Sequence, residues 1–480
     1  MAAAGHVYAL LSPADLDLIH DGALKILERM GMEIQNHHLL QVLAEHGAQV
    51  DYGAERVTFS AGFVERFIAE APKHDWDSAM PRVHGSAGVY ESLYHDPESG
   101  ELMPWTEERL AHYFALARRV PRVSGASMLG SRIAVPGPLE PLYERFYCWK
   151  YGAFESGTIL IDAICPYLLE LYEIRAAERC QPLPDVFRGA VYLIPALKLG
   201  RHEAYQVAFF RERGLKVRIG HSMATMGATA PVTLAGAVTL NLAENLALCI
   251  LDWALFGRKA LHLGCSLAPM DMHTAIRPFG RPEMAIANLM TAQLARYYEA
   301  SFSGHAGLSD AKLPSVEAGA QKAISAIATL LAGGILWMDV GLLGTDEICS
   351  PIQMVLDGEL LGALSRFAQE IGVDEEAIGL DMILEAGPGG HYLDRMHTAR
   401  HCREEVWTPS LWSREMVRTW LSEDRRLDVD RARDVVLQVQ SQQPDGLVRG
   451  DMSPSAEQQM LDIIERASSA LVAGTGSKVV

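Results

Sequence analysis

The sequence lacks paired cysteines. Its 480 residues include 7 cysteines, and no two of them stand in a C-x-x-C arrangement. An odd number of scattered cysteines is typical of free thiols in a reducing compartment, and it argues against a disulfide-stapled secreted protein. The N-terminus also has no basic segment followed by a long apolar core, so a secretory signal is not indicated. We therefore expect a cytoplasmic protein.

Uninterrupted apolar runs of membrane-spanning length are absent as well. The longest apolar stretch, residues 234–256, is interrupted by four polar side chains, those of Asn241, Glu244, Asn245 and Asp252. This pattern indicates a buried helix rather than a membrane span. Basic residues are also few, since 42 Lys and Arg face 60 Asp and Glu for a formal charge of −18. That balance disfavours nucleic acid and anionic membranes as partners.

Several signatures of common enzyme classes are missing. The sequence contains no H-E-x-x-H, no G-x-S-x-G, no Walker A motif and no dinucleotide-binding fingerprint. Zincin, serine hydrolase and simple nucleotide-binding functions therefore have no support from motifs. His262 and Cys265 have the residue types of zinc ligands, but no further cysteine pair is placed to complete a tetrahedral site. We expect no bound metal.

What is present is an alternation of short β-type runs with long helical ones, beginning near residue 121. The expected strands are 122–128, 158–164, 189–194, 216–219, 260–264, 300–303, 335–340 and 382–386. Eight βα units predict a TIM (β/α)8 barrel of class α/β, and a doubly wound open sheet is the competing architecture. We expect an N-terminal α+β extension over residues 1–120, the barrel over 121–415 and a helical tail over 416–480.

The N-terminal extension has clear helix signals. Ser12 followed by Pro13 and Asp15 indicates a helix start, and the apolar spacing continues to Gly31. A short helix over residues 37–45, a strand over 56–59 and a helix capped by Ser60 are expected next. Residues 89–94 and 101–105 flank a turn and predict a hairpin.

The segments that follow the expected strands are rich in small residues and histidines. They contain the candidate site residues His221, Gly227, His305, Asp346, Glu347, Gly389, Gly390 and His391. Barrel enzymes carry their sites at the C-terminal ends of the strands, which makes these loops the expected site. Gly387–Arg414 is the densest such segment, although a barrel-closing turn with packed aromatics accounts for its composition equally well. Asp346 and Glu347 are interpreted either as acid/base carboxylates or as a local helix cap.

Aromatic side chains near the expected strand ends suit a quaternary ammonium ligand. The candidates for such a box are Trp105, Trp149, Phe302, Trp337 and Tyr392. Aromatic faces attract cations through the ring quadrupole, whereas packing in the core is the alternative role for each one.

Four segments resemble the trimethylamine methyltransferase family. They are GPGGHYLDRMHTARHCREEVWTP from Gly387, MGATAPVTLAGAVTLNLAENLA from Met226, LSDAKLPSVEAG from Leu308 and SPIQMVLDGEL from Ser350. The resemblance implies a TIM barrel that transfers a methyl group from a methylated amine to the cobalt of a cobalamin (corrinoid) carried by a partner protein. Family members that act on trimethylamine carry pyrrolysine. This chain has no non-standard residue, so it resembles the members that demethylate quaternary amines such as glycine betaine.

The chemistry of the leaving group is consistent with that division. A quaternary ammonium releases a neutral tertiary amine that needs no proton, so the enzyme has mainly to hold and align the cation. We expect the aromatic faces and Asp346 or Glu347 to hold the cation and the histidines and glycines of the loops to border the corrinoid. Lys312, Arg277 or Arg281 would pair with a substrate carboxylate.

Two departures from the family pattern bear on the substrate. Ser350-Pro351-Ile352-Gln353 stands where the family has S-L-E-Q, and Ser413-Arg414 stands where it has D-R. A sulfonium or methoxylated methyl donor therefore stays open, and so does a barrel that binds betaines without catalysis. We also expect a homo-oligomer.

Overall fold

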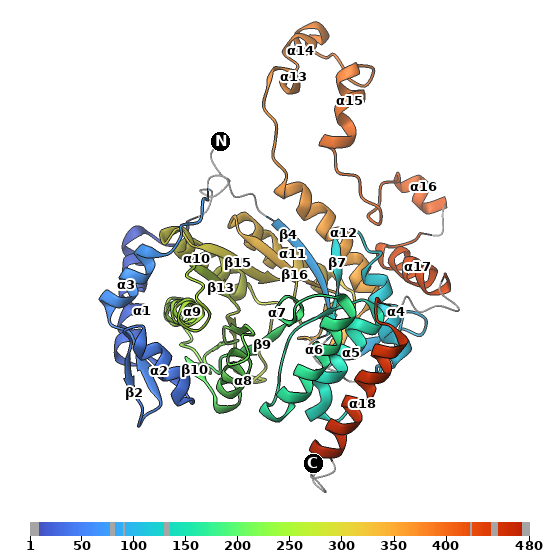
Figure 1. Ribbon diagram of the computed structural model, residues 1–480. Helices are drawn as coiled ribbons and strands as arrows, with labels where there is room; N and C mark the ends of the chain where they lie inside the picture. The colour runs from blue at the N-terminus through green and yellow to red at the C-terminus, as the bar shows by residue number, and fades with distance from the viewer. Residues whose placement is uncertain are drawn as a thin grey trace.

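A curled parallel sheet forms the centre of the molecule (Figure 1). The computed structural model describes residues 9–76, 82–89, 92–128, 135–422, 425–442 and 450–472. Six strands run in the order β13-β15-β16-β4-β7-β8. Their bounds are His262–Cys265, Ser301–Ala306, Ile335–Val340, Arg82–Val89, Val123–Met128 and Phe154–Glu155. All five neighbouring pairs are parallel. The α/β class predicted from the sequence is confirmed.

Two further parallel strands continue this sheet. β9 (Gly189–Tyr192) pairs with β11 (Val217–Gly220), and a parallel bridge joins Thr158 to Ala190 on the way from β8 to β9. No ladder links β11 to β13 within the described residues. The described strands therefore form a curled, partly closed parallel sheet of six strands with a two-stranded parallel sheet beside its β8 edge.

Long helices cover the convex face of the sheet. The largest are α9 (Leu234–Phe256), α10 (Pro282–Tyr297), α11 (Val316–Leu331) and α12 (Pro351–Ala368), in agreement with the long helical segments predicted between the strands (Figure 1). On β16 the side chains of Leu336, Met338 and Val340 are buried, while Ile335, Trp337 and Asp339 on the other face are not. Alternation along a strand places successive side chains on opposite faces, so the second set lies on the concave inner face.

One helix, α9, is long and apolar enough to cross a membrane by length and composition, and 67% of its most apolar window is buried inside the protein. Its polar side chains bind the sheet and the loops. Asn245 exchanges hydrogen bonds with the backbone of Gly264, and Glu244 accepts one from the hydroxyl of Ser222 at 2.8 Å. Here α9 serves as a core helix that holds the ends of β11 and β13.

The N-terminal region from α1 to α3 is a small α+β unit, and the predicted extension to residue 120 is too long because β4 belongs to the central sheet. α1 (Pro13–Arg29) begins with a capping box of Ser12 and Asp15 and packs against α9. The next elements are β1 (Met32–Ile34), α2 (His37–Glu45), β2 (Gln49–Asp51), β3 (Arg56–Thr58) and α3 (Ala61–Glu70). β10 (Lys198–Leu199) completes a four-stranded sheet with β1, β2 and β3. This unit closes one side of the barrel sheet.

Two strand predictions are wrong, and two strands of the central sheet, β4 and β8, were missed. Residues 382–386 belong to α14 (Leu380–Ala386), and residues 158–164 contain only the bridge at Thr158 and a short 3-10 helix, η2 (Asp162–Ile164). A short apolar run does not by itself distinguish strand from helix. β4 escaped prediction because its sequence, RVHGSAGV, is rich in small residues with weak strand preference.

The remaining elements complete the two ends of the sheet. The hairpin predicted around residues 96–100 is confirmed, since β5 (Leu93–His95) pairs antiparallel with β6 (Leu102–Met103). The short strands are β12 (Thr225–Met226), β14 (Ala268–Pro269), β17 (Leu342–Leu343) and β18 (Ile348–Cys349). The outer helices are α4 (Glu107–Ala117), η1 (Gly137–Leu139), α5 (Glu140–Tyr151), α6 (Cys165–Arg179), α7 (Leu183–Val186) and α8 (Arg201–Arg211).

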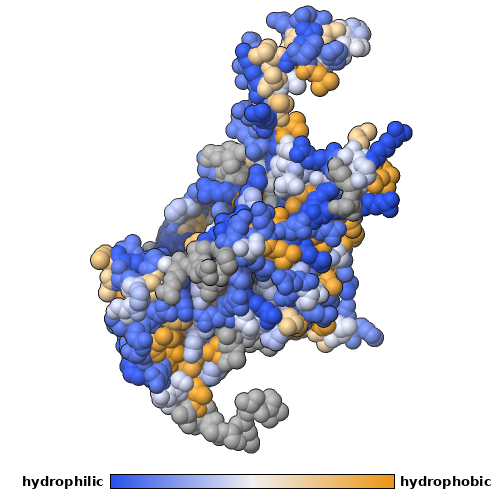
Figure 2. All heavy atoms as spheres, turned by 90° about the vertical axis from the view of Figure 1, so that its right-hand side faces the viewer, coloured by the Kyte–Doolittle hydropathy of each residue, from blue (hydrophilic) through white to orange (hydrophobic). Residues whose placement is uncertain are grey.

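After α12 the chain leaves the body as an arm, which we define as residues 369–410 (Figures 1 and 2). The arm contains α13 (Glu375–Ile378), α14 and α15 (Met396–Glu405). Beyond it, α16 (Val417–Ser422) leads to α17 (Asp428–Ser441), which packs on α12 and α4. The last helix, α18 (Pro454–Leu471), packs on α5 and α6.

Candidate active site

Aromatic and imidazole rings line up across the inner face of the sheet. His305 on β15, Trp337 on β16 and His84 on β4 occupy paired positions on neighbouring strands. The Trp337 ring stacks on His84 with centroids 4.8 Å apart and planes 19° apart, yet Trp337 is 47% exposed. Parallel strands are ordinarily buried on both faces. A half-exposed tryptophan in the middle of such a sheet shows that the inner face is accessible.

Two carboxyl groups lie beside these rings. Asp339, two residues beyond Trp337 on β16, forms a short hydrogen bond with Nε2 of His305. Asp346 follows in the turn after β16, where its φ of 69° lies in the left-handed region. Burial, and then the nearby charge of Asp339, raise the pKa of Asp346 to about 7. Its Oδ1 is buried and has no hydrogen-bond partner among the described residues. Such a group is typical of a site that meets a cation or a proton.

Arg277 brings a positive charge to the same cluster. Its guanidinium donates to the carbonyl of Ser266 and lies 4.8 Å from the ring centroid of Phe279. Burial lowers the pKa of Arg277 to about 10, although Asp346 opposes that shift. Burial would also lower the pKa of His305, but the Asp339 carboxylate outweighs it, so that pKa is raised. We call Arg277, His305, Asp339 and Asp346 the charged cluster; it contains positive and negative groups that interact with one another.

His221 borders the cluster from the end of β11. Its Nε2 lies 3.1 Å from Oγ of Ser266. Burial, followed by the charge of Arg218, lowers the pKa of His221 to about 4, so the imidazole is neutral at pH 7. A Cβ at Gly264 would lie 3.1 Å from the His221 ring. Glycine at that position lets the ring lie directly over β13.

A buried ion pair behind the sheet supports these groups. Nζ of Lys322 on α11 lies 3.0 Å from Oδ2 of Asp357 on α12, and neither side chain is more than 1% exposed. Lys322 also donates to the carbonyls of Gly307 and Asp339, while Asp357 accepts from the amide of Gly341 at 2.8 Å. The pair fixes the ends of β15 and β16, and with them the turn that carries Asp346.

Two more exposed aromatic side chains lie on neighbouring parallel strands, β8 and β9. Phe154 on β8 is 60% exposed, and Tyr192 at the end of β9 is 37% exposed. Arg218 donates to the Tyr192 hydroxyl at 2.7 Å. The sequence analysis missed Phe154, Tyr192, His84 and Asp339. The alternation in residues 335–340 was the available signal for Asp339, because it places Asp339 on the face of Trp337.

Three predicted members of the aromatic box lie in the hydrophobic core instead. Trp105 is 5% exposed and donates from Nε1 to Ser92, and Trp149 on α5 is 2% exposed and donates to Glu155. Phe302 is 1% exposed on the outer face of β15. The structure does not bring them to the inner face, because each belongs to a surface that packs on helices.

Other predicted residues lie on the loops that follow the strands. Glu347 has an exposed side chain, and its carbonyl accepts from the amide of Leu93. Lys312 is exposed and lies beside Gly344. Gly227 has a φ of 90° in the turn after β12. These residues belong to the same end of the sheet as Asp346 but are not part of its cluster.

The glycine-histidine segment lies elsewhere, which corrects its predicted position at the end of a barrel strand. Gly389, Gly390, His391 and Tyr392 are on the arm between α14 and α15. α12 starts at the C-terminal end of β16 and runs back, and its Gly358 lies against Val120 shortly before β7. The arm therefore emerges at the N-terminal ends of the strands, on the side opposite Asp346.

Local backbone geometry explains the glycines of that segment. Gly387 and Gly389 have φ values of 64° and 83°, which favour glycine. A Cβ at Gly390 would lie 2.2 Å from the carbonyl oxygen of Ala386. His391 is largely exposed and faces only Asp394, at 3.6 Å. The density of glycine here reflects a tight turn.

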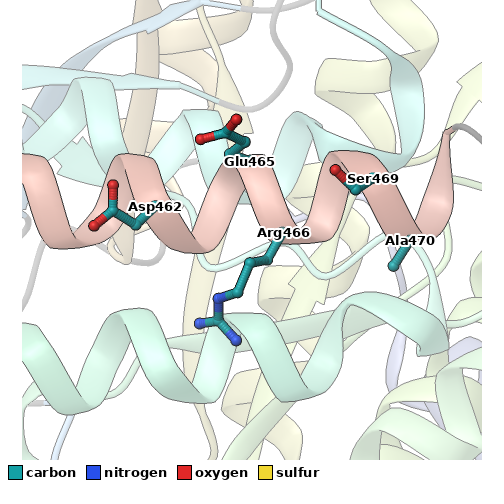
Figure 3. A pocket seen from close by; sticks show the side chains of 5 residues that line it. All are labelled: Asp462, Glu465, Arg466, Ser469 and Ala470. Carbon is teal, nitrogen blue, oxygen red and sulfur yellow. The ribbon is translucent and has the colours of Figure 1, made fainter.

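Other features of the described residues do not form a site. A hollow along α18 is lined by Asp462, Glu465, Arg466, Ser469 and Ala470, and its arginine pairs with Glu170 of α6 (Figure 3). His262 binds the hydroxyls of Ser301 and Ser303. No group of three His, Cys, Asp or Glu side chains suited to a metal ion is present in the described part of the chain.

Comparison with known proteins gives one consistent family. The family model described as trimethylamine methyltransferase (MTTB) matches residues 3–80 and 205–471. A glycine betaine methyltransferase from Desulfitobacterium hafniense Y51 is 26% identical over 87% of this chain and 89% of its own length. A trimethylamine methyltransferase MttB from Methanosarcina thermophila is 29% identical over 86% and 88%.

Solved structures were also compared. The monomethylamine methyltransferase MtmB of Methanosarcina barkeri aligns over 94% of both chains, with a TM-score of 0.42 and 10% sequence identity. The family match confirms the resemblance found in the sequence motifs. The chain belongs to the trimethylamine methyltransferase (MTTB) family.

Proposed function

We propose that this protein is a methyltransferase that moves a methyl group from a quaternary amine of the glycine betaine class to the cobalt of a corrinoid carried by a partner protein. The observation that carries the proposal is the half-exposed Trp337, stacked on His84, on the same inner face as Asp339 and the raised-pKa carboxyl of Asp346. The relative described as a glycine betaine methyltransferase supports the same substrate class.

The inner face suits a quaternary ammonium group. Such a cation carries no N–H, so it is bound by aromatic faces and nearby negative charge rather than by hydrogen bonds. Trp337 supplies an aromatic face, and Asp346 supplies a carboxylate whose Oδ1 is free of protein partners in the described structure. We assign the cation to the space that these two side chains border.

A carboxylate on the substrate would face Arg277. The Nε of Arg277 is buried and has no hydrogen-bond partner among the described residues, and its guanidinium interacts electrostatically with Asp346. A zwitterion satisfies both groups at once, with its cation toward Asp346 and its anion toward Arg277. A substrate without a carboxylate would leave Arg277 unpaired, which disfavours its binding.

The reaction requires alignment more than proton transfer. The bond between the methyl carbon and nitrogen breaks, its electron pair stays on nitrogen, and a neutral tertiary amine leaves. The corrinoid, when present, supplies the cobalt nucleophile that receives the methyl group. This chain therefore contributes to catalysis by orienting the methyl group and restricting water around it, which is catalysis by positioning. Lys322 and Asp357 hold the carboxyl groups in place for that purpose.

Exposed apolar residues around the C-terminal ends of the strands support a protein partner. They lie on the segments that precede α9, α10 and α11 or follow β11, and they are Met223, Val232, Met272, Ile276, Leu313 and Val316. Val316 is 90% exposed and Met272 is 74% exposed. A clustered apolar rim of this kind is typical of a protein contact. We also propose that the eight strands close into a TIM barrel beneath this rim.

A location in the cytoplasm suits this function, since all seven cysteines are free thiols. We propose it on that ground.

The direct test is methyl transfer to free Co(I) cobalamin. A panel of glycine betaine, proline betaine, carnitine, trimethylamine, a sulfonium compound and a methoxylated aromatic compound would be assayed for methylcobalamin. We expect product from at least one carboxylated quaternary amine and none from trimethylamine. Product only from the sulfonium or methoxylated compound would replace the proposed donor. Tight binding of betaines with no product from any compound would instead establish a non-catalytic binding protein.

The role of Arg277 has a separate control. Choline shares the trimethylammonium group of glycine betaine but has no carboxylate. Arg277→Gln should weaken glycine betaine binding, as measured by calorimetry, and leave any choline binding unchanged. Equal losses for both ligands would show that Arg277 acts on the fold of the site rather than on the carboxylate.

A further inference from the structure

The arm has no core of its own. No residue from 369 to 410 is buried. Ten of its large apolar side chains are at least 38% exposed, and they are Ile371, Val373, Ile378, Leu380, Ile383, Leu384, Tyr392, Leu393, Met396 and Val406. Met382 and Trp407 are partly buried. Leu393 is 89% exposed and Val373 is 76% exposed. Figure 2 shows the arm standing clear of the body with apolar side chains on its surface.

The helices of the arm are too short to be stable without packing. α13 has 4 residues, α14 has 7 and α15 has 10. Isolated helices of fewer than about 12 residues are marginal in water, because nucleation is costly and few hydrogen bonds repay it. The contacts between them include a hydrogen bond between Nε2 of His397 and the carbonyl of Glu376, and exposed ion pairs such as Arg395–Glu385, which contribute little. An ordered arm therefore needs a surface to pack against.

The base of the arm is fixed to α12. The Glu359 carboxylate accepts hydrogen bonds from the amides of Ser410, Leu411 and Trp412 and from the Ser410 hydroxyl at 2.6 Å. The Trp407 ring lies against Gly362, where a Cβ would be 3.0 Å from its Nε1. The arm begins directly after α12, and its last residues are bound to the same helix. Both ends of the arm are therefore anchored on α12.

The body carries a matching surface on α11. The outward side of this helix contains Gly319, Ala320, Ala323, Ile324 and Leu331, with Ile324 58% exposed and Leu331 54% exposed. Of the two charged residues of α11, Glu317 is exposed in the first turn and Lys322 is buried against Asp357. Surface helices ordinarily present charged residues to water along their length, so an outward face that is uncharged beyond the first turn indicates a contact.

We propose that the arm of one copy packs on the outward face of α11 of a second copy, and that the exchange is reciprocal. A two-fold axis would make both contacts identical, and each copy would give one arm and receive another. Burying the exposed aliphatic side chains of both arms against apolar surface favours association and offsets its entropic cost. The corrinoid protein is a poorer occupant, because the arm emerges on the side opposite Asp346; this exclusion rests on the proposed function.

The test is sedimentation velocity of the full-length chain at micromolar concentration, with circular dichroism as the check of folding. The wild type should be a dimer or a larger even-numbered assembly. Leu384→Glu/Leu393→Glu on the arm should convert it to a monomer, and Ile324→Glu on α11 should do the same. Leu18→Glu is the matched control, since Leu18 is 71% exposed on α1, and it should leave the assembly intact.

A mixing experiment separates this arrangement from its alternatives. When the arm variant and the α11 variant are combined, the intact arm of one meets the intact α11 of the other, so a heterodimer should form although neither variant pairs with itself. A monomeric wild type, or an assembly that survives the arm variant, would overturn the proposal. Dissociation by the arm variant alone, with no effect of Ile324→Glu, would overturn the assignment to α11. A monomer whose arm becomes protected only with a corrinoid protein would identify that protein as the occupant.

Discussion

The inner face of the barrel sheet and the arm have similar compositions but opposite support. On the inner face, Trp337 stacks on His84, and the strand beneath it is held from behind by Lys322 and Asp357. On the arm, His391 is exposed and faces Asp394, three residues away, and no residue of the arm is buried. A dense set of aromatic, histidine and glycine residues therefore marks a candidate site only where packed structure fixes the side chains.

The largest expected effect concerns that support. Lys322→Met leaves the Asp357 carboxylate buried without its cation, which should lower the free energy of unfolding by roughly 3–5 kcal/mol. Arg395→Met removes an exposed ion pair on the arm and should leave the free energy of unfolding nearly unchanged, because solvent screens such a pair. Urea denaturation measures both. Lys322→Met/Asp357→Leu should recover much of the loss. If Lys322→Met and Arg395→Met lowered the free energy of unfolding equally, the inner face would not be better supported than the arm.

The second prediction uses the raised pKa of Asp346. Because its pKa is about 7 in the folded protein and lower when unfolded, the carboxyl favours the folded state most below about pH 4. That contribution is lost as the pH rises through 7. Asp346→Asn should therefore be more stable than wild type at pH 8, by roughly 2–4 kcal/mol, as measured by urea denaturation at pH 5 and pH 8.

The same titration should control ligand binding. A cation is attracted by the ionised carboxylate, so glycine betaine affinity of the wild type should increase as the pH rises through about 7. Calorimetry with Asp346→Asn should give a weaker affinity with little pH dependence. A pH profile unchanged by the substitution would show that Asp346 does not face the cation.

A matched pair of aromatic substitutions compares the two regions directly. Trp337→Leu removes the ring on the inner face and should weaken glycine betaine binding by 1–2 kcal/mol, which is roughly 5- to 30-fold. Tyr392→Leu removes a ring on the arm and should leave the affinity unchanged. Fluorescence or calorimetric titration measures both. The comparison fails if Tyr392→Leu has the larger effect.

The smallest expected effect is that of Gly390→Ala. The added Cβ would lie 2.2 Å from the carbonyl oxygen of Ala386, so the turn between α14 and α15 must shift. Limited proteolysis should show faster cleavage within the arm. Glycine betaine affinity should stay within about twofold of the wild type, because the turn lies far from the inner face. A large loss of affinity would connect the arm to the binding site.

Much of the fold follows from local patterns in the sequence. The Ser12 cap and the period of α2 predict helices that the structure confirms, and β16 was predicted with its full length. These signals succeed because capping and periodicity act within a few residues. β4 was missed, since strands made of small residues depend on their neighbours in the sheet for stability.

The candidate site was only partly predictable. His305, Asp346 and His221 were identified from their positions after expected strands, and Trp337 as an aromatic of the cation box. The structure places His305 and Trp337 at paired positions on the inner face and shows charge interactions between His305, Asp346 and His221. Asp339 pairs with a residue 34 positions away, and such a pairing leaves no local pattern. Gly387, Gly389 and Gly390 were expected after a barrel strand, whereas they form a turn on the arm. Composition alone does not distinguish a turn from a ligand site.

The most direct test is a crystal structure of the protein with glycine betaine. The account predicts ligand density on the inner face of the sheet, with the trimethylammonium group against Trp337 and Asp346 and the carboxylate toward Arg277. Density beside His391 and Tyr392 on the arm, with the inner face empty, would contradict it.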